Sequence, residues 1–545
     1  MKFTRFWQRV LGALIGGGLL VASFPPYDLV WLAPPALALL TVSWHGARVR
    51  EGLLLGFISG LVFFGSHLSW VSVVGDDAWT LLAVYCALWI GLVGGAVAGT
   101  SKLRWWPAIV PLLWVAEEAG RDRIPLGGFP WGRLAFGQTS TLLTPYAALA
   151  GAPAVTFAVA LIGALLGWVA LSFRVAGPRL VVGSLVATIL ACTLGGLMPR
   201  PTDGQTGPNS EPAYLTAAVV QGNVPNLGLS VGDDSMQVLL NHVRVTEQLA
   251  NQVKAGTATQ PDLVVWPESS SDVDPFKNQV ARTLIQTAAN GIKAPILVGA
   301  VINDPTDPTH VLNAGIVWGP SGTADAGPGQ FYVKQHPVPF GEWVPFRSLL
   351  TPYITKLELI PRDFAAGKVT GVLQVGPARV GDVICFEVAY DNIVRAAVTG
   401  ANTTGLLAGL GGRLLTVQTN NATYGNTPQL SQQVAMSQLR AVEHGRAVLV
   451  AATSGITAVV APNGQLMQQL PENVPGVIVA KIPLRDDLTI ADRVGEWPEW
   501  VATVLGLLAL LLAVRLHYRR RAHSHCSQDP VVGSPDTTIV QEPVP

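Results

Sequence analysis

The sequence predicts a multi-span α-helical membrane domain of about eight helices, joined to a large α/β domain on the extracytoplasmic side. Composition is the first reason: 49% of the 545 residues are hydrophobic, only 13% are charged, and the mean hydropathy is +0.39. That balance is too apolar for an ordinary soluble protein and is typical of a membrane protein with a sizeable polar domain. The other reasons are the order of the apolar runs and the charges between them.

Seven apolar segments lie in the first 200 residues, and each can span or nearly span a hydrocarbon core of about 30 Å. They are Val10–Ser23, Leu29–Trp44, Leu53–Val74, Trp79–Gly99, Trp105–Ala116, Pro153–Phe173 and Leu180–Met198. An eighth segment, Trp500–Leu516, lies near the end of the chain. An alternative for the first segment is a cleavable signal peptide, but Ser23-Phe24-Pro25-Pro26 is a poor cleavage site, so we expect an uncleaved anchor.

Basic residues gather in every second interval between these segments. They are Lys2, Arg5 and Arg9, then Arg48 and Arg50, then Lys102 and Arg104, then Arg174 and Arg179, and finally Arg515, Arg519, Arg520 and Arg521. The intervals that alternate with these basic ones carry Asp28 and then Asp76 and Asp77. By the positive-inside rule the basic intervals are cytoplasmic, so we expect the chain from about Pro199 onward to lie outside the plasma (inner) membrane.

The loop Leu126–Gln138 contains the run Gly127-Gly128-Phe129-Pro130-Trp131-Gly132-Arg133. Aromatic residues at a bilayer surface suit an interfacial arm that contacts lipid headgroups or acyl chains. A plain aromatic-belt loop is an equally good interpretation. Trp131 is therefore a candidate substrate-binding residue.

We divide the chain into a transmembrane domain (1–198), a linker (199–213), an α/β domain (214–497), a C-terminal transmembrane helix (498–517) and a disordered cytoplasmic tail (518–545). Within the α/β domain, strand-like runs such as Leu263–Trp266 and Val380–Cys385 alternate with helix-like stretches such as Pro428–His444. That alternation predicts a layered domain large enough to bury its own core. The net charge is zero, so we expect no nucleic acid partner.

Cys385 is the only cysteine of the α/β domain, and it follows the apolar run Val380–Ile384. The other cysteines are Cys86, Cys192 and Cys526. With neither a CxxC motif nor a Cys/His cluster in the sequence, we expect no metal and no cofactor. One interpretation of Cys385 is a buried small hydrophobic residue, since free cysteine is among the most buried residue types. The other is a nucleophile held at the end of a buried strand.

Two more charged residues follow strand-like runs. Glu268 comes after Leu263–Trp266, and Lys334 comes after Phe331–Val333. Each alone is more often a solvated charge, but with Cys385 they have a chemical logic. A thiol with a pKa of about 8.5 needs a base, and a carboxylate in a partly dry pocket can take its proton. An ammonium can stabilise the thiolate and then an oxyanion.

Several motifs surround these residues. They are Trp266-Pro267-Glu268, the stretch Lys334–Phe346 with its Phe-Gly-Glu-Trp-Val-Pro core, Cys385-Phe386-Glu387, and the stretches Val220–Pro225, Thr419–Gly425 and Leu439–Arg446. Together they resemble the nitrilase (carbon–nitrogen hydrolase) superfamily and, with the spans, its membrane branch, the apolipoprotein N-acyltransferase family. The resemblance implies an αββα sandwich with Glu268 as general base, Lys334 as transition-state stabiliser and Cys385 as nucleophile.

The resemblance also implies supporting roles for Glu342, near Lys334, and for Glu387, beside the nucleophile. Further candidate substrate-binding residues are Trp343, Phe346 and Phe386. The sequence departs from many relatives at Phe386, where we would expect Tyr, and after Pro225, where Asn226–Ser230 lacks a Trp. These departures bear on the preference for the donor lipid.

The implied reaction is acyl transfer in two steps. Cys385 takes an acyl chain from a membrane phospholipid as a thioester, and the N-terminal α-amine of a diacylglyceryl-apolipoprotein accepts it. We expect a monomer. One alternative is a membrane-anchored amidase with the same triad, which would have no use for eight spans. Another is a transporter, but apart from Glu117 and Glu118 the spans hold few charges for an ion path.

Overall fold

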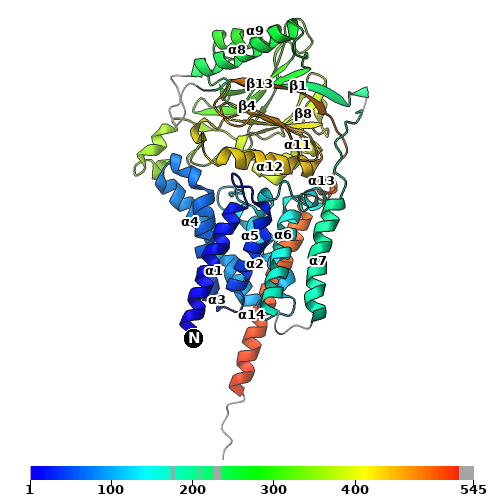
Figure 1. Ribbon diagram of the computed structural model, residues 1–545. Helices are drawn as coiled ribbons and strands as arrows, with labels where there is room; N and C mark the ends of the chain where they lie inside the picture. Colours follow the sequence, from blue (N-terminus) through cyan, green and yellow to red (C-terminus); the bar gives the residue numbers. More distant parts are fainter. Residues whose placement is uncertain (1, 173–177, 208–209, 225–234, 527–545) are drawn as a thin grey trace, which may run out of the picture.

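The computed structural model describes residues 2–172, 178–207, 210–224 and 235–526. A bundle of membrane helices stands at one end of the molecule, and an α/β domain sits on top of it (Figure 1). The membrane helices are α1 (Lys2–Ala22), α2 (Ala33–Trp44), α3 (Val49–His67), α4 (Asp76–Thr100), α5 (Trp106–Arg121), α6 (Ala147–Ser172), α7 (Pro178–Leu197) and α14 (Trp497–Cys526). Among the described residues, four spans are long and apolar enough to cross a membrane: Val49–His67, Asp76–Thr100, Thr144–Ser172 and Trp497–Arg519.

Glycines bring α3 and α4 close together. A Cβ built on Gly52 would lie 2.5 Å from the carbonyl oxygen of Gly94, and one built on Gly56 would lie 2.5 Å from that of Ile90. Small residues four apart let helix backbones approach in a bilayer, where dispersion forces replace the hydrophobic effect between helices. The pattern Gly52, Gly56, Gly60 therefore explains the tight α3–α4 pair.

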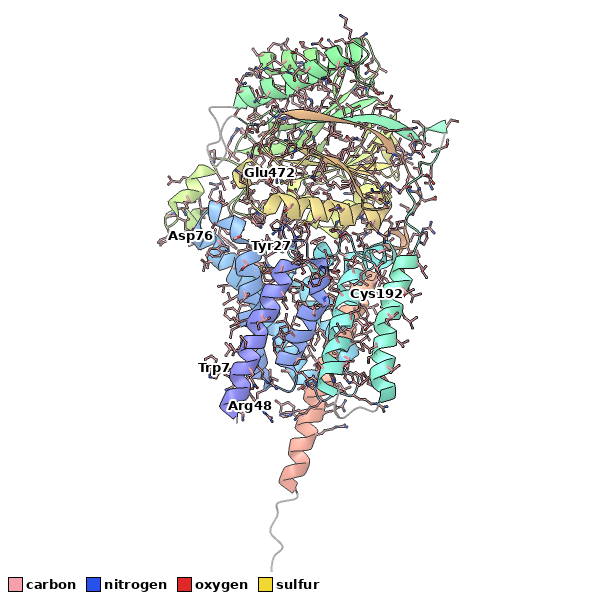
Figure 2. All side chains as sticks on the ribbon, in the orientation of Figure 1. Trp7, Tyr27, Arg48, Asp76, Cys192 and Glu472 are labelled. Atoms are coloured by element: carbon pink, nitrogen blue, oxygen red, sulfur yellow. The ribbon has the colours of Figure 1, made fainter. Side chains whose placement is uncertain are left out.

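Charge is asymmetric along this bundle. Figure 2 labels Trp7 and Arg48 at the end away from the α/β domain, and Tyr27 and Asp76 near the end next to it. α14 carries the basic C-terminal segment away from the α/β domain (Figure 1).

Two predicted boundaries differ from the structure. The segment Leu53–Val74 is not one helix, because α3 ends at His67 and a separate 3-10 turn covers Ser69–Val73. α14 continues to Cys526, so the tail expected to be disordered from residue 518 begins as helix. The rest of that tail, 527–545, and the segment after Pro225 that lacks a Trp, lie outside the described residues.

The α/β domain contains two sheets. The first has the order β13-β1-β2-β3-β4-β5, with β6 paired to β4, and the second has the order β12-β11-β10-β9-β8-β7. Strands of the first sheet are β1 (Tyr214–Gln221), β2 (Leu263–Val265), β3 (Ile296–Asn303), β4 (His310–Gly319), β5 (Gly327–Val333), β6 (Asp363–Phe364) and β13 (Gly476–Pro483). Those of the second are β7 (Val372–Val375), β8 (Ala378–Ile384), β9 (Leu414–Thr419), β10 (Val448–Ala452), β11 (Ala458–Val460) and β12 (Leu466–Gln469).

Helices cover both outer faces, which makes an αββα sandwich. α8 (Ser235–Lys254) and α9 (Gln279–Ile292) cover the first sheet, while α11 (Asp391–Thr399) and α12 (Gln429–His444) lie between the second sheet and the membrane helices (Figure 1). Two short helices, α10 (Arg347–Leu350) and α13 (Ile490–Val494), complete the fold. The predicted fold class, a helical membrane domain plus an αββα sandwich, is confirmed.

The two domains share one apolar core. Val383 of β8 and Met436 of α12 belong to the same buried cluster as Trp70, Trp131 and Phe136 of the membrane domain. Separate clusters lie between the sheets and beneath α8 and α9. The sandwich is therefore packed onto the membrane helices as well as tethered to them.

Candidate active site

Cys385 lies at the turn that follows β8. All seven residues of β8 are buried, and the strand ends at Ile384, one residue before the predicted Cys385. The cysteine has a φ of +55° and begins a 3-10 turn that runs to Ala389. Such a left-handed conformation costs a non-glycine residue about 1–3 kcal/mol and persists only where its surroundings hold it. The half-buried thiol is thus presented at a turn that other groups must stabilise.

Glu387 holds that turn. Its carboxylate accepts hydrogen bonds from the backbone N–H of Ile384 (2.7 Å), Gln335 (2.6 Å) and His336 (3.0 Å), and from the hydroxyl of Tyr332 (2.9 Å). Burial raises the pKa of Glu387, and the hydrogen bonds oppose this effect. Because the donors come from the Cys385 turn and from the chain around Lys334, Glu387 joins these two segments.

Lys334 lies between two carboxylates. Its Nζ is 3.1 Å from Glu268 Oε1 and 2.9 Å from Glu342 Oε1, and the ammonium is only 1% exposed. Asn313, on β4, donates to the same two carboxylates, at 2.7 Å and 2.9 Å. The backbone N–H of Asn420 donates to Glu268 Oε2 at 2.7 Å. Two donors therefore meet Oε1 of Glu268 and one meets Oε2, which fixes the position of this carboxylate.

The thiol lies beside this cluster. The hydroxyl of Thr419 is 3.3 Å from Cys385 Sγ, and the next residue, Asn420, holds Glu268. Burial and then the charge of Glu268 raise the pKa of Cys385, the charge of Lys334 lowers it, and together these effects bring it to about 12. Burial also lowers the pKa of Lys334, but the two carboxylates raise it more, so that its pKa lies well above the ordinary value. The resting site thus pairs a neutral thiol with a permanent cation.

Sequence reasoning missed several polar residues of this site. Asn313, Tyr332 and Thr419 contact the predicted residues but were not predicted. Asn313 interrupts the otherwise apolar run of β4, and this is a signal that could have found it. Tyr332 and Thr419 lie in strands with other polar residues, so the pattern does not single them out. Glu268, Lys334, Glu342, Cys385 and Glu387, which were predicted, lie together.

The aromatic residues proposed to bind substrate are more scattered. Phe386 is buried and stacks on Trp131 at 5.7 Å and on Phe129 at 5.7 Å. Trp343 donates its indole N–H to the carbonyl of Pro337 at 3.1 Å, and Phe346 is 71% exposed. Trp131 differs from the expectation of lipid contact, because it is 1% exposed and lies between the two domains.

Two family models match the chain. Apolipoprotein N-acyltransferase N-terminal domain matches residues 16–165, and Carbon-nitrogen hydrolase matches residues 216–487. The apolipoprotein N-acyltransferase of Mycolicibacterium smegmatis is 38% identical, over 94% of this chain and 86% of its own length. The chain belongs to the apolipoprotein N-acyltransferase family.

Other relatives agree with this family. The apolipoprotein N-acyltransferase of Azotobacter vinelandii is 31% identical, over 95% of this chain and 96% of its own. Among solved structures, an amidase from Nesterenkonia sp. AN1, of the nitrilase superfamily, is 17% identical with a TM-score of 0.37 and covers 56% of this chain and all of its own. The predicted resemblance to the membrane branch of the nitrilase superfamily is confirmed.

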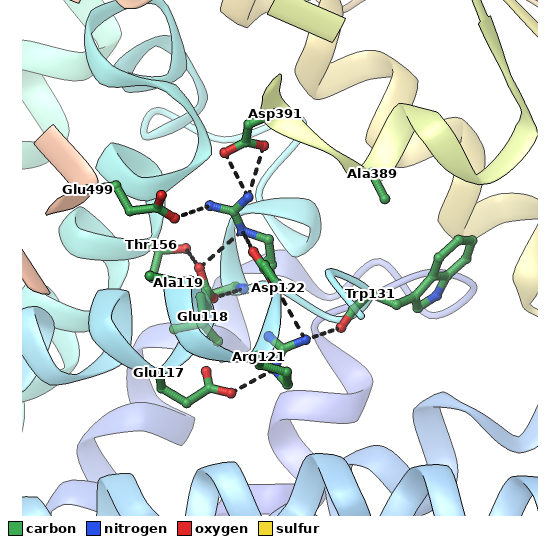
Figure 3. A network of polar contacts seen from close by, with 12 residues as sticks. Glu117, Glu118, Ala119, Arg121, Asp122, Trp131, Thr156, Ala389, Asp391 and Glu499 are labelled. Carbon is green, nitrogen blue, oxygen red and sulfur yellow. Dashed lines mark hydrogen bonds and ion pairs between the residues drawn. The ribbon is translucent and has the colours of Figure 1, made fainter. Parts of the chain in front are cut away.

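In this member of the apolipoprotein N-acyltransferase family, an ion network joins the two domains (Figure 3). Arg133, at the end of the Gly127–Arg133 run, pairs with Asp391 of α11 (2.8 Å) and with Glu118 and Asp122 (3.3 Å each). Asp391 also pairs with Arg440 of α12 at 2.7 Å. The Gly127–Arg133 run therefore connects the membrane helices to α11 and α12 of the α/β domain.

Proposed function

We propose that this chain transfers an acyl chain from a membrane phospholipid, through a thioester on Cys385, to the N-terminal α-amine of a diacylglyceryl-apolipoprotein. The observation that carries the proposal is the clustering of Glu268, Lys334 and Glu342 beside a thiol whose neighbour in the chain, Phe386, stacks on Trp131 of the membrane domain. Membership of the apolipoprotein N-acyltransferase family supports the same activity over hydrolysis of a small amide.

In the first step the sulfur of Cys385 attacks the ester carbonyl of the phospholipid while its proton passes to Glu268. Lys334 stabilises the oxyanion of the tetrahedral intermediate. The intermediate collapses to a thioester, and Glu268 returns the proton to the departing lysophospholipid oxygen. Glu342, held by Lys334 and Asn313, keeps the ammonium in place.

In the second step the α-amine of the apolipoprotein attacks the thioester carbonyl. Glu268 accepts a proton from the attacking amine, the carbon–sulfur bond breaks, and the thiolate is reprotonated. Both lipid substrates are confined to a membrane, so a site mounted on membrane helices meets them at a raised effective concentration.

We infer that the α/β domain lies outside the cytoplasm and that the membrane is the plasma (inner) membrane. The charge asymmetry of the bundle supports this, with Arg48 at the end away from the α/β domain and Asp76 near the end next to it (Figure 2). We expect the enzyme to act as a monomer.

Radiolabelled phospholipid tests the proposal. Full-length protein in lipid vesicles should acquire a hydroxylamine-sensitive label, and a diacylglyceryl-peptide should then remove the label and carry it as an amide. Cys385→Ser should acquire no hydroxylamine-sensitive label, and Glu268→Gln should acquire it at least about 100-fold more slowly. Equal labelling of wild type and Cys385→Ser would refute the role of Cys385. Release of free fatty acid without accumulation of label would favour a hydrolase.

A further inference from the structure

A glutamine on α12 is held by the membrane domain. The side-chain carbonyl of Gln432 accepts hydrogen bonds from the indole N–H groups of Trp131 (2.7 Å) and Trp70 (3.1 Å), and its amide donates to the carbonyl of His67 (3.1 Å). Gln432 is buried, and its partners lie more than 300 positions away in the sequence. We call His67, Trp70, Trp131 and Gln432 the glutamine socket. A buried amide with its donors and acceptors satisfied holds one orientation.

The next residue of α12 faces the thiol. Gln433 Oε1 accepts from Asn421 (2.8 Å) and from the hydroxyl of Thr419 (3.3 Å), and that hydroxyl also lies 3.3 Å from Cys385 Sγ. Consecutive residues of a helix point about 100° apart, so a short length of α12 contacts the membrane domain on one side and the partner of the thiol on another.

Beside the contacts through α12, a second set of contacts between the membrane domain and Cys385 runs through Trp131. Its ring lies nearly parallel to Phe386, with an interplanar angle of 11°, and Phe386 is the residue bonded to Cys385. The arm that carries Trp131 is itself fixed, since its carbonyl accepts a hydrogen bond from Arg121 at 2.8 Å (Figure 3). Trp131 belongs to both of these sets of contacts, and Phe129 on the same arm adds a further contact with Phe386.

We propose that Trp131 and Gln432 are positioning residues, through which the membrane domain holds the Cys385 turn in its reactive conformation. The inference rests on the proposed function, because it concerns the same nucleophile. The positive φ of Cys385 requires support from outside the turn. On the sandwich side, backbone N–H groups near Lys334 bind Glu387, and Arg440 donates to the carbonyls of Val388 and Ala389. A misplacement of about 1 Å at a reacting atom can cost about 100-fold in rate.

Reactivity of the thiol tests this without any acyl substrate. We would measure alkylation of Cys385 by iodoacetamide between pH 7 and 10 in full-length protein in lipid nanodiscs, with peptide mass spectrometry to separate Cys385 from the other cysteines. The variants are Gln432→Leu and Trp131→Leu, with Trp131→Phe and Trp70→Phe as milder changes that each delete one hydrogen bond. Gln438→Leu is the matched control, because Gln438 lies on α12 and bonds only Gly464 of the sandwich.

Loosening the turn hydrates the thiol, so Gln432→Leu and Trp131→Leu should alkylate at least tenfold faster at pH 8. The same variants should form the acyl thioester at least tenfold more slowly. Trp131→Phe should lie nearer wild type than Trp131→Leu, and Gln438→Leu should match wild type in both measurements. A purely structural role would lower the melting temperature without moving the pH profile of alkylation, and that result would overturn the inference. Should wild type form no thioester, the proposed function fails, while the alkylation comparison still decides the positioning role.

Discussion

Cys385 combines a nucleophilic position with a protonated resting state. Burial and the nearby charge of Glu268 raise the pKa of its thiol to about 12. Lys334 does not offset both effects, because it also pairs with Glu342. In the proposed reaction the proton must therefore leave as the bond to the acyl carbonyl forms.

The Glu268→Gln substitution should separate two effects of Glu268. Its charge raises the pKa of Cys385, and its carboxylate accepts the thiol proton in the proposed reaction. Removing the negative charge removes a cause of the raised Cys385 pKa, so the thiolate fraction should rise. We expect alkylation of Cys385 at pH 8.5 to be about threefold or more faster than in wild type, because alkylation follows the thiolate. Acyl transfer should fall by about 100-fold or more, because the base is lost. Peptide mass spectrometry and labelled phospholipid measure the two rates, and slower alkylation in the variant would contradict the charge effect assigned to Glu268.

At the scale of the secondary-structure elements, the site forms where the ends of strands from the two sheets meet. β5 delivers Lys334, β8 delivers Cys385, and Glu387 ties the two ends together through backbone N–H groups. Backbone donors cannot rearrange as side chains do, so the distance between ammonium and thiol depends on one carboxylate.

Glu387→Gln should therefore damage both activity and stability. A glutamine amide presents an NH₂ group to backbone N–H donors, which leaves buried donors without acceptors, at about 1–3 kcal/mol each. We expect thioester formation to fall by about 100-fold or more and the melting temperature of the detergent-solubilised protein to drop. Glu247→Gln on the exposed face of α8 is the control and should match wild type in both measurements. A Glu387→Gln protein with normal melting and normal acylation would show that Glu387 does not hold the Cys385 turn to the chain around Lys334.

α8 contains a titratable element that is independent of catalysis. His242 is fully buried, its Nδ1 lies 2.8 Å from the carbonyl of Val238, and burial lowers its pKa to about 4. The unfolded chain binds this proton below about pH 6.5 and the folded chain does not, so stability is complete above pH 6.5 and falls as the pH drops towards 4. The loss should reach about 3 kcal/mol at pH 4.

Thermal melting at pH 7 and pH 4.5 measures this effect. Wild type should lose more stability than His242→Gln over that interval, because the glutamine does not titrate. Equal losses in the two proteins would mean that His242 carries its proton when folded.

The positions of Glu268, Lys334 and Cys385 at strand ends could be predicted, because each residue follows a short apolar run in the sequence. Contacts between residues from distant parts of the chain could not be predicted in this way. Asn313 interrupts the apolar run of β4, but Asp382 likewise interrupts β8, and its partner is Thr416 rather than the charged cluster. The pattern alone therefore does not tell a site residue from a packed one.

At the scale of the whole molecule, the membrane domain is part of the active-site support. Trp131 illustrates why this was not predictable: glycines and aromatics suit a bilayer surface and a domain interface equally well. Only its contact with Gln432, 301 positions away, distinguishes the two. Contact across the domains also involves the ion network around Arg133, where Glu118, Asp122 and Asp391 surround a buried guanidinium.

The Asp391→Asn substitution tests how much the contact between the two domains depends on the ion network around Arg133. Burial raises the pKa of Asp391, but Arg133 and Arg440 lower it more, so its net pKa lies below the ordinary value and the residue is ionised above about pH 4. Neutralising Asp391 leaves both guanidinium groups with one carboxylate fewer, and breaking a buried pair costs about 3–5 kcal/mol. The variant should melt several degrees below wild type at pH 7.

The control for this prediction is Asp77→Asn, which breaks an exposed pair with Lys356 that also crosses between the domains. Exposed pairs contribute about 0–1 kcal/mol, so this variant should melt close to wild type. The deficit of Asp391→Asn should shrink as the pH falls below about 4, because the unfolded wild-type chain then binds a proton that folded Asp391 binds only at lower pH. A deficit independent of pH would mean that Asp391 stabilises the contact between the domains by packing rather than by charge.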